Sequence, residues 1–452
     1  MSATITSPRA VPDERFLTPK RRIGADGATL ACIFICALLV IPARLVLRGL
    51  PISLTPAEVI GLFVGLWWAC AHLTTTLGVA KGANAVRTVL FLNATALLAT
   101  YGYSTYGYLP EDELNLNDHA MVIAFAYLGV ALLLCDGVRG RDRLDTVLRT
   151  VVIAGAVIAV IGALQFLLAF DVTSYLRLPV LRVNSEDPFV WERSSFRRVS
   201  ATTSNPIEFG VVCAMALPLA VHFGFQVHGK GRSAWGWWLC ALLLGSGLMF
   251  SVSRSAVLGL AGVAVVLGLG WSARRRLHAI WVVGLFLVLI KFTSPGLLGT
   301  FRGLFANMGS DDSVEWRTHD YPAAAAEISQ HPWLGRGLGT WYAPKYLVFD
   351  NQYILTLVHT GIIGLVMFVG LFVVGMYAAL RSRYLSRDPD VRDLGLTLTA
   401  CLTVPLIGAA TFDLLSFHAV TGLSFLLIGA AGAMLRNERQ QARARPWQRG
   451  EL

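Results

Sequence analysis

The residues of this sequence best suited to chemistry are an arginine and an Asp-Asn pair at the ends of apolar segments. Arg254 stands in the short turn "SVSRSAV" between two apolar runs, and Asp350 and Asn351 begin the stretch "DNQYILTLVHTGIIG". Guanidinium is a permanently charged, planar fork that binds phosphate in a bidentate way. A carboxylate within hydrogen-bond reach of a hydroxyl can accept its proton. These residue types together predict a site for a phosphorylated ligand beside a carboxylate.

Further basic residues lie in the two longest polar connections, and they indicate a phosphate-binding site less specifically. Each of them can equally be a solvated side chain or one that faces lipid headgroups. Arg254 differs because apolar residues flank it on both sides, where a charge is costly without a partner. The basic residues of the long connections are Arg177, Arg182, Arg193, Arg197, Arg198, Arg302, Arg317, Arg336 and Lys345.

His359 is the other polar residue of the stretch that begins at Asp350. It follows nine residues later, which is about 13 Å along a helix at about 1.5 Å per residue. At about 100° per residue the two side chains point to opposite sides, so we do not expect them to act on the same atom. Asp350 or Asn351 can also be an ordinary helix cap, and His359 can be a buried hydrogen-bonding residue.

The composition indicates that lipid surrounds most of this chain. Of the 452 residues, 55% are hydrophobic and only 15% are charged, and the mean hydropathy is +0.59. Soluble domains carry about 25% charged residues. The net charge of +10 comes from basic residues in short connections between apolar runs, so it reports orientation and not nucleic-acid binding. The seven cysteines lie in or beside apolar runs without metal-ligand spacing, which predicts small buried side chains, no disulfide framework and no metal site.

Apolar runs of membrane-spanning length recur along the chain and predict about twelve transmembrane helices. Because unpaired backbone groups are too costly in hydrocarbon, the fold must be an all-α polytopic bundle. The predicted spans are 28–47, 56–75, 85–103, 118–137, 147–170, 207–226, 235–252, 255–271, 278–293, 358–380, 392–410 and 415–435.

The charge of the connections predicts the orientation of these spans. Seven basic connections, from "PKRR" to the final "RNERQQARARPWQR", all fall on one side if there are twelve spans. The positive-inside rule makes that side cytoplasmic and places both termini inside. Residues 1–27 are then a cytoplasmic tail before a retained helix, without a signal-peptide cleavage site. Residues 28–435 form the transmembrane domain, and residues 436–452 form a basic cytoplasmic tail.

Two long connections, 171–206 and 294–357, lie on the predicted extracytoplasmic side. A structureless loop of the second one's length would be unusual, and the alanine-rich "DYPAAAAEISQHP" at 320–332 predicts a short helix there. The glycines of "LGRGLGTW" favour turns over a phosphate-binding loop, and no nucleotide-binding P-loop motif occurs. The aromatic residues around this helix form an interfacial belt or stack on sugar rings, and they are Trp316, Trp333, Trp341, Tyr342 and Tyr346.

Three segments in this order resemble the bacterial O-antigen ligase and O-antigen polymerase superfamily. They are "RRVSATTSNPIEFGVVCAMALPLA" (197–220), "SVSRSAVLGLAGV" (251–263), and "WRTHDYPAAAAEISQHPWLGRGLGTWYAP" followed by "DNQYILTLVHTGIIGL". The likeness covers about residues 197–365, and the first five spans match only in hydropathy. It implies a metal-independent membrane glycosyltransferase without a cofactor in the bacterial inner membrane. The implied donor is a glycan on an undecaprenyl-type diphosphate lipid, and the acceptor is a glycan or glycolipid hydroxyl.

The resemblance also implies roles for individual residues. Arg254 and Arg317, with Arg197 or Arg198, would hold the diphosphate. Asp350 would accept the proton of the acceptor hydroxyl, and it stands where the ligases carry a histidine. Asn351 would orient that carboxylate or the sugar, while Arg336 and His359 would contribute to substrate binding.

Three functions agree with this pattern. The replacement of the ligase histidine by Asp350 favours a surface-polysaccharide polymerase, and a ligase that moves the glycan to a different acceptor is the first alternative. About twelve helices is also a common number in transporters, which makes transport the second alternative. The two halves of the chain show no inverted repeat, and the spans hold few acidic residues, which disfavours an ion-coupled carrier.

Overall fold

The fold was analysed in a computed structural model of the chain. The structure describes residues 26–74, 82–176, 178–184, 190–193, 196–306 and 321–444. Three residues singled out above lie outside these ranges: the predicted site residue Arg317, the basic residue Arg177 and the aromatic residue Trp316.

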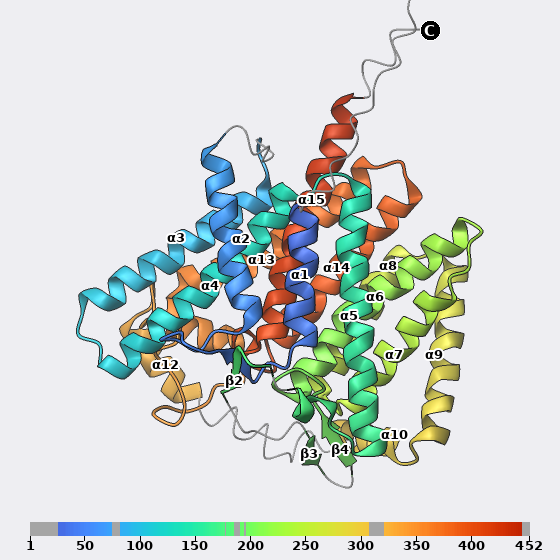
Figure 1. The fold of residues 1–452 in the computed structure, drawn as a ribbon, viewed down its shortest axis with the longest axis horizontal. Coiled ribbons are helices and arrows are strands. Elements are labelled where there is room, and N and C mark those ends of the chain that lie inside the picture. Colours follow the sequence, from blue (N-terminus) through green and yellow to red (C-terminus); the bar gives the residue numbers. More distant parts are fainter. Residues whose placement is uncertain are drawn as a thin grey trace, which may run out of the picture.

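Twelve long helices run through the described part of the chain as a bundle (Figure 1). Nine of them are long and apolar enough to cross a membrane, and three shorter apolar helices, α1, α7 and α8, complete the number that the sequence predicts. The twelve are α1 (Gly27–Val40), α2 (Pro56–Leu73), α3 (Ala85–Tyr106), α4 (Glu111–Gly137), α5 (Arg141–Leu168), α6 (Pro206–Gly229), α7 (Trp235–Phe250), α8 (Arg254–Gly270), α9 (Ala273–Thr293), α13 (Gln352–Leu385), α14 (Pro389–Gly408) and α15 (His418–Ala444).

The remaining described elements gather at one end of the bundle, at the bottom of Figure 1, which we call the loop face. They include the short helix that the alanine-rich segment predicts, now seen as α12. These elements are β1 (Leu45–Leu47), η2 (Val172–Tyr175), β2 (Leu181–Val183), β3 (Val190–Arg193), β4 (Phe196–Val199), α10 (Leu297–Ala306), α12 (Tyr321–Gln330) and η4 (Leu414–Ser416).

The first span is shorter than its hydropathy predicts. The apolar run continues to residue 47, but α1 ends at Val40, and Leu45–Leu47 forms strand β1, which pairs antiparallel with β2. Pro42 has no N–H for a helical bond, and the Arg44 guanidinium donates to the Thr173 carbonyl at 2.9 Å. The end of the apolar run therefore fastens the first long connection to the bundle.

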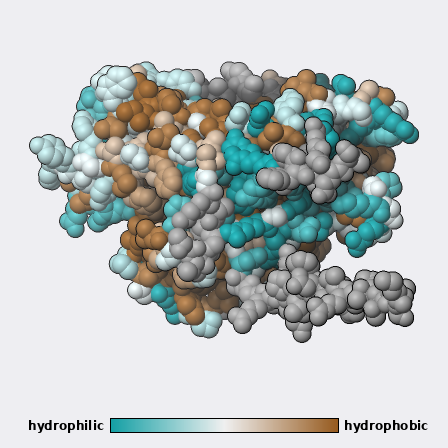
Figure 2. All heavy atoms as spheres, turned by 90° about the horizontal axis from the view of Figure 1, so that it is seen from above, coloured by the Kyte–Doolittle hydropathy of each residue, from teal (hydrophilic) through white to brown (hydrophobic). Residues whose placement is uncertain are grey.

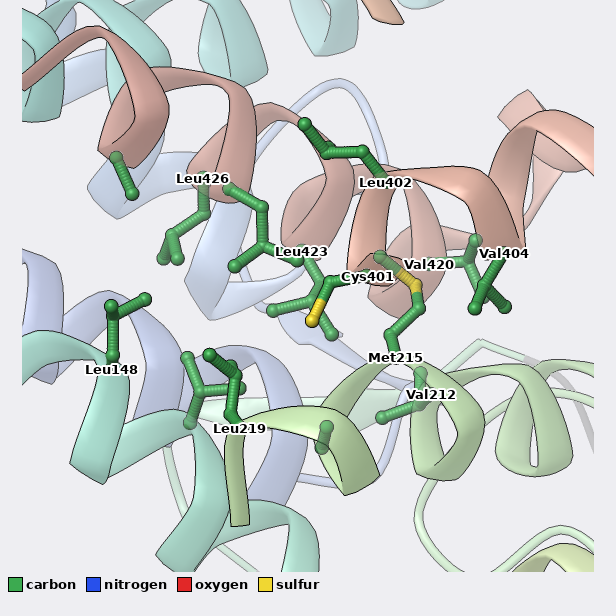
Figure 3. Close-up of a cluster of buried hydrophobic side chains, with 14 of the residues drawn as sticks. Leu148, Val212, Met215, Leu219, Cys401, Leu402, Val404, Val420, Leu423 and Leu426 are labelled. Carbon is green, nitrogen blue, oxygen red and sulfur yellow. The ribbon is translucent and has the colours of Figure 1, made fainter. Parts of the chain in front are cut away.

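Helices α6 and α15 form the centre of the bundle. Figure 3 shows their side chains interleaved with those of α5 and α14, with Leu148, Met215, Cys401 and Leu423 among them. The most apolar stretch of α15 is 89% buried, whereas only 6% of that of α9 is buried. Helix α9 therefore presents most of its surface outward, as expected of a helix at the lipid boundary.

Glycines allow α2 and α4 to pack closely. A Cβ added at Gly129 of α4 would lie 2.6 Å from the Gly65 Cα and 2.8 Å from the Gly61 carbonyl oxygen of α2. Small residues spaced four apart let helix backbones approach one another, which is a common means of packing in membranes. This contact fixes the place of α4, whose first turn lies at the loop face.

The end of the bundle opposite the loop face carries both described ends of the chain, and we call it the terminal face. Arg143 forms an ion pair with Asp26 before α1, and Arg436 of α15 donates to the Val138 carbonyl after α4. Figure 2 views the molecule from this side and shows hydrophilic side chains over its middle. Acidic residues partner several of its basic ones, as in Arg275–Asp393 at 2.5 Å. The two described ends thus share one face, and its cytoplasmic location stays a prediction.

The orientation can be tested with reporter fusions. Alkaline phosphatase joined after Tyr108, at the loop face, is expected to be active because it folds only outside the cytoplasm. The same enzyme joined after Arg232, at the terminal face, is expected to be inactive. Activity in the reverse order would show that the loop face is cytoplasmic.

The glycine contact predicts a large effect of a small substitution. Gly129→Ala should push α2 and α4 apart and cost about 1–3 kcal/mol of unfolding free energy, as overpacking generally does. Thermal unfolding in detergent would measure this. Gly236→Ala is the matched control, because an added Cβ there meets nothing within 4 Å. Equal melting of the two variants would contradict the close packing.

Candidate functional site at the loop face

The connection between α14 and α15, residues 409–417, is the centre of the candidate site, and we call it the α14–α15 turn. The start of α13 is bonded to both of its ends: the Gln352 N–H donates to the Ala409 carbonyl, and the Gln352 side chain accepts from the Leu415 N–H, each at 2.8 Å. Asp350 and Asn351 directly precede Gln352. The two predicted residues are therefore held beside this turn.

Helix α8 begins against the same turn. The Thr411 hydroxyl donates to the Ser255 hydroxyl at 2.8 Å. Arg254 is the first residue of α8, and Ser253 caps the helix by accepting from the Ala256 N–H. Arg254 therefore directly precedes Ser255, the residue of α8 that contacts the turn.

Helices α6 and α15 begin on the other side of the turn and are joined by a buried carboxylate. Glu208 accepts hydrogen bonds from the Ser204 N–H at 2.8 Å, the Ser204 hydroxyl at 2.6 Å and the Ala419 N–H at 2.6 Å. Asn205 caps α6 through a bond from the Ile207 N–H. Four helices, α6, α8, α13 and α15, therefore begin around the α14–α15 turn. Their N-terminal N–H groups and dipoles favour an anion at this place.

Strand β4 brings one of the two predicted loop arginines to the same place. The Arg198 Nε donates to the Ser251 carbonyl at 3.4 Å, in the turn that precedes Arg254. Successive side chains of a strand point to opposite faces, and Arg197 is exposed while Arg198 is half-buried. The structure therefore brings Arg198 close to the start of α8 and turns Arg197 away.

The backbone at these two turns is strained. Val252 has a φ of 46° and Ala201 a φ of 53°, in the left-handed region that side chains rarely adopt. Such conformations cost about 1–3 kcal/mol each and persist where the surrounding structure enforces them, often at functional sites. Val252 lies two residues before Arg254, and Ala201 lies three residues after Arg198.

Asp413 is a carboxylate of this site that the sequence analysis did not select. It lies in the α14–α15 turn, is partly buried, and is close enough to Asp350 and Glu208 for their charges to act on its pKa. Burial raises the pKa of Asp413 to about 6, and the two nearby carboxylates act in the same direction. No local sequence pattern marks Asp413, because its neighbours come from α6 and α13.

A second polar group behind the turn also escaped the sequence analysis. The His418 Nδ1 lies 2.6 Å from Glu58 Oε1 of α2, and the Tyr127 hydroxyl lies 3.4 Å from each of these atoms. Glu58 is fully buried and also caps its own helix by accepting from the Thr55 N–H. This group ties α2, α4 and α15 together directly beneath the site.

Arg336 lies in a different cluster, where acidic partners neutralise it. Its Nη2 donates to both carboxylate oxygens of buried Glu113, at 2.9 and 2.8 Å, and also contacts the Tyr346 hydroxyl. Lys345 reaches Glu113 and Asp112, each at 2.8 Å. Burial opposes the charge on Arg336, but the bonds to Glu113 outweigh it and raise the pKa, and the bonds of Lys345 raise its pKa in the same way. These contacts fasten the loop before α13 to the first turn of α4.

His359 lies beside a break in α13 that the sequence did not reveal. Gly361, with φ 65°, interrupts the helix, and residues 332–337 lie against the break. Their backbone groups bond it on both sides: Arg336 N–H to Val358 O, Gly337 N–H to His359 O, and Ile362 N–H to Pro332 O, each at 2.9 Å. The buried His359 ring contacts the backbone of Trp341 at 3.3 Å. The glycines thus make turns, as predicted, and His359 has hydrogen-bond partners within the protein.

The aromatic residues divide into packed and exposed ones. Trp341 is stacked on Tyr346 and Phe349, with centroid distances of 4.4 and 5.3 Å, whereas the side chain of Trp333 is 65% exposed. Among the residues that the structure describes, no three His, Cys, Asp or Glu side chains lie together in a way that could hold a metal ion.

Comparison with known proteins identifies one segment that contributes residues to this site. Residues 239–369 match the family model described as O-antigen ligase, and they contain Arg254, Asp350, Asn351 and the broken part of α13. No protein of curated function matches the chain. The match and the apolar helices support a multi-pass protein of the bacterial inner membrane that takes part in glycan transfer of the O-antigen ligase or polymerase type. Residues 239–369 of the chain are thus similar to the O-antigen ligase family.

Proposed function

We propose that this protein transfers a glycan from an undecaprenyl-diphosphate-type lipid to an acceptor hydroxyl at the loop face, and that this face is extracytoplasmic. Three contacts support the proposal: Ser255, directly after Arg254, and Gln352, two residues after Asp350, bond the α14–α15 turn, and Arg198 bonds Ser251 just before α8. The site requires no nucleotide sugar, cofactor or metal ion in this proposal. The apolar tail of the donor lies along the bundle in the bilayer.

The diphosphate is both the handle and the leaving group of the donor. The negative charge of the diphosphate increases as its bond to the anomeric carbon breaks. Hydrogen-bond donors of the protein that contact it there therefore stabilise the transition state more than the ground state. Arg254 and Arg198 supply guanidinium forks, and the starts of α6, α8, α13 and α15 supply N–H groups and favourable dipoles. Arg317 is expected to join them from the segment outside the described residues.

Asp350 and Asn351 act on the acceptor side of the reaction. The Asn351 side-chain oxygen accepts from the N–H groups of Tyr353 and Ile354, at 3.0 and 3.3 Å. Asn351 is therefore the cap of α13, and its contribution is to fix Asp350, the preceding residue, in place. In this proposal the Asp350 carboxylate binds the acceptor hydroxyl and orients it toward the anomeric carbon.

The product distinguishes the two forms of the activity. The aspartate at position 350 favours a polymerase, whereas the matched family model is described by its ligases, which keeps the ligase in consideration. A polymerase lengthens the lipid-linked chain, and a ligase moves the glycan to another acceptor. Cells that lack the protein should accumulate short lipid-linked glycans in the first case and full-length ones in the second. Unchanged lipid-linked and surface glycans would overturn the proposal.

The break in α13 is the one observation that favours transport, because transporters bind substrates at broken helices. In this protein, however, residues 332–337 occupy the hydrogen-bonding groups on both sides of the break. A Cβ at Gly335 would lie 2.4 Å from the His359 carbonyl carbon, so the packing there is tight. The break serves to dock the loop, and we favour glycan transfer over transport.

Removal of the Arg254 guanidinium should slow transfer strongly. Arg254→Ala is expected to lower turnover about 10²–10³-fold, the usual loss when one donor to developing charge is removed. Arg254→Lys should recover only part of this, because lysine lacks the planar fork. Turnover would be measured in membranes supplied with a lipid-diphosphate oligosaccharide. The exposed Arg302 of the same face provides the control, Arg302→Ala. Equal activity of both alanine variants would remove Arg254 from the site.

Arg336 should contribute more to the stability of the protein than to binding of the donor lipid. Arg336→Ala removes one of the two cationic partners of the buried Glu113, and because Lys345 remains, the expected cost is about 1–3 kcal/mol of unfolding free energy. The second substitution Glu113→Gln should restore much of this loss in the double variant. Thermal unfolding would measure stability, and the donor KM would measure binding. A raised KM with unchanged stability would instead support the predicted role of Arg336 in substrate binding.

A further inference from the structure

Asp413 has a position in the candidate site that its sequence context does not explain. It belongs to the α14–α15 turn, which also contains the buried apolar residues Phe412 and Leu414. Its own backbone carbonyl accepts from the Ser416 N–H at 3.1 Å, which closes the short helix η4. The Asp413 side chain does not cap this helix.

Contacts to three different helices hold the turn around Asp413. Gln352 of α13 bonds Ala409 and Leu415 at its two ends, and Ser255 of α8 accepts from Thr411. Glu208 of α6 bonds the N–H of Ala419 just beyond it. The turn that carries Asp413 is therefore bonded to the starts of α8 and α13, which follow directly after Ser253 and Asn351, and its end is bonded to α6.

Two like charges act on Asp413: Asp350, which lies before α13, and Glu208, which lies in α6. The basic residues near the same turn are Arg254, which begins α8, and Arg198, which bonds Ser251 before α8. The Glu58–His418 pair lies beyond Glu208. Burial and the carboxylates of Asp350 and Glu208 together raise the pKa of Asp413 to about 6, against 3.8 for an ordinary aspartate.

We infer that Asp413 is the proton acceptor of the transfer reaction, while Asp350 holds and orients the acceptor hydroxyl. This inference rests on the proposed function and adds a catalytic residue to it. The hydroxyl oxygen forms the new bond to the anomeric carbon as its proton passes to the Asp413 carboxylate. The bond from that carbon to the diphosphate breaks, and the lipid diphosphate leaves with the electron pair. Water then removes the proton from Asp413.

Two carboxylates with different surroundings can divide the work in this way. General-base efficiency is greatest when the pKa of the base lies close to the working pH. A carboxyl with a pKa of about 6 is mostly ionised at neutral pH and is a stronger base than an ordinary aspartate. Burial and the acidic neighbours make the negative charge of Asp413 unfavourable, and for this reason the carboxylate accepts a proton more readily.

The pH dependence of turnover tests the inference. The purified protein would be assayed in lipid nanodiscs between pH 5 and pH 8 with a lipid-diphosphate oligosaccharide, which is consumed as donor and, for a polymerase, as acceptor. Wild-type turnover should rise with pH through about 6, as Asp413 loses its proton, and then level off. Asp413→Asn should lower turnover about 10²–10⁴-fold at pH 7.5, the usual share of a general base, without a large change in donor KM. Asp413→Asn should also abolish the rise of turnover with pH.

Three further variants make the result decisive. Asp118→Asn, at an exposed carboxylate of the loop face, is the matched control and should keep the wild-type profile. Asp413→Glu should regain part of the turnover together with a pH-dependent rise. Asp350→Asn should lose turnover but keep the rise. The inference is overturned if Asp413→Asn stays within threefold of wild type, or if Asp350→Asn alone loses the rise.

Stability separates a catalytic loss from misfolding. When the pKa of an aspartate is raised in the folded state, the folded protein becomes less stable as the pH rises from the ordinary pKa to the raised one. Asp413→Asn should therefore melt no lower than wild type at pH 7.5. If Asp413→Asn does melt lower, the test is the pH at which turnover reaches half of its plateau, compared between wild type and Asp413→Glu. The same midpoint in both proteins overturns the inference. Absence of transfer by the wild-type protein itself would instead overturn the proposed function.

Discussion

A helix that begins at the edge of a bilayer has N–H groups without helical partners, and these groups must find acceptors in the protein or in a ligand. Around the α14–α15 turn this requirement arises four times within one small region. Side chains of Asn205, Ser253 and Asn351 meet part of it for α6, α8 and α13, and Glu208 does so for α15. The dipoles of these four helix starts favour a phosphorylated headgroup at this place.

The described part of the loop before α13 is fastened to the bundle through its backbone. Residues 332–337 take the place of a helical turn at the break in α13, and the glycines on the two sides fit against one another. A Cβ at Gly361 would lie 2.4 Å from the Trp333 carbonyl carbon, and one at Gly335 would lie equally close to His359. The loop therefore cannot shift without displacing α13. Since Asp350 stands at the start of the same helix, the dock also determines where that carboxylate lies.

Arg254 and Arg336 show how one residue type serves two purposes. Both lie in the segment that matches the O-antigen ligase family, and both are arginines next to apolar residues. Arg336 is bound on one side by Glu113 and Glu327 and stacks near Tyr346, so its charge is used within the protein. Arg254 begins α8 beside the α14–α15 turn, where four helices begin. The role of an arginine therefore depends on contacts with distant segments, such as Arg336 with Glu113, which the local sequence does not show.

The sequence by itself determined the all-α fold, the twelve spans, the short helix α12 and the gathering of Arg254 and Asp350 at one face. These features follow from local hydropathy, helix length and the alternation of spans, which depend on neighbouring residues only. Tertiary structure alone decided the pairing of β1 with β2, the break at Gly361, the neutralisation of Arg336 and the position of Asp413 near Asp350. Each of these depends on contacts between distant segments, such as Arg336 with Glu113, which lie 223 residues apart. Burial and the charges of such partners determine whether a polar side chain is structural or reactive, and only the packed bundle brings those partners together.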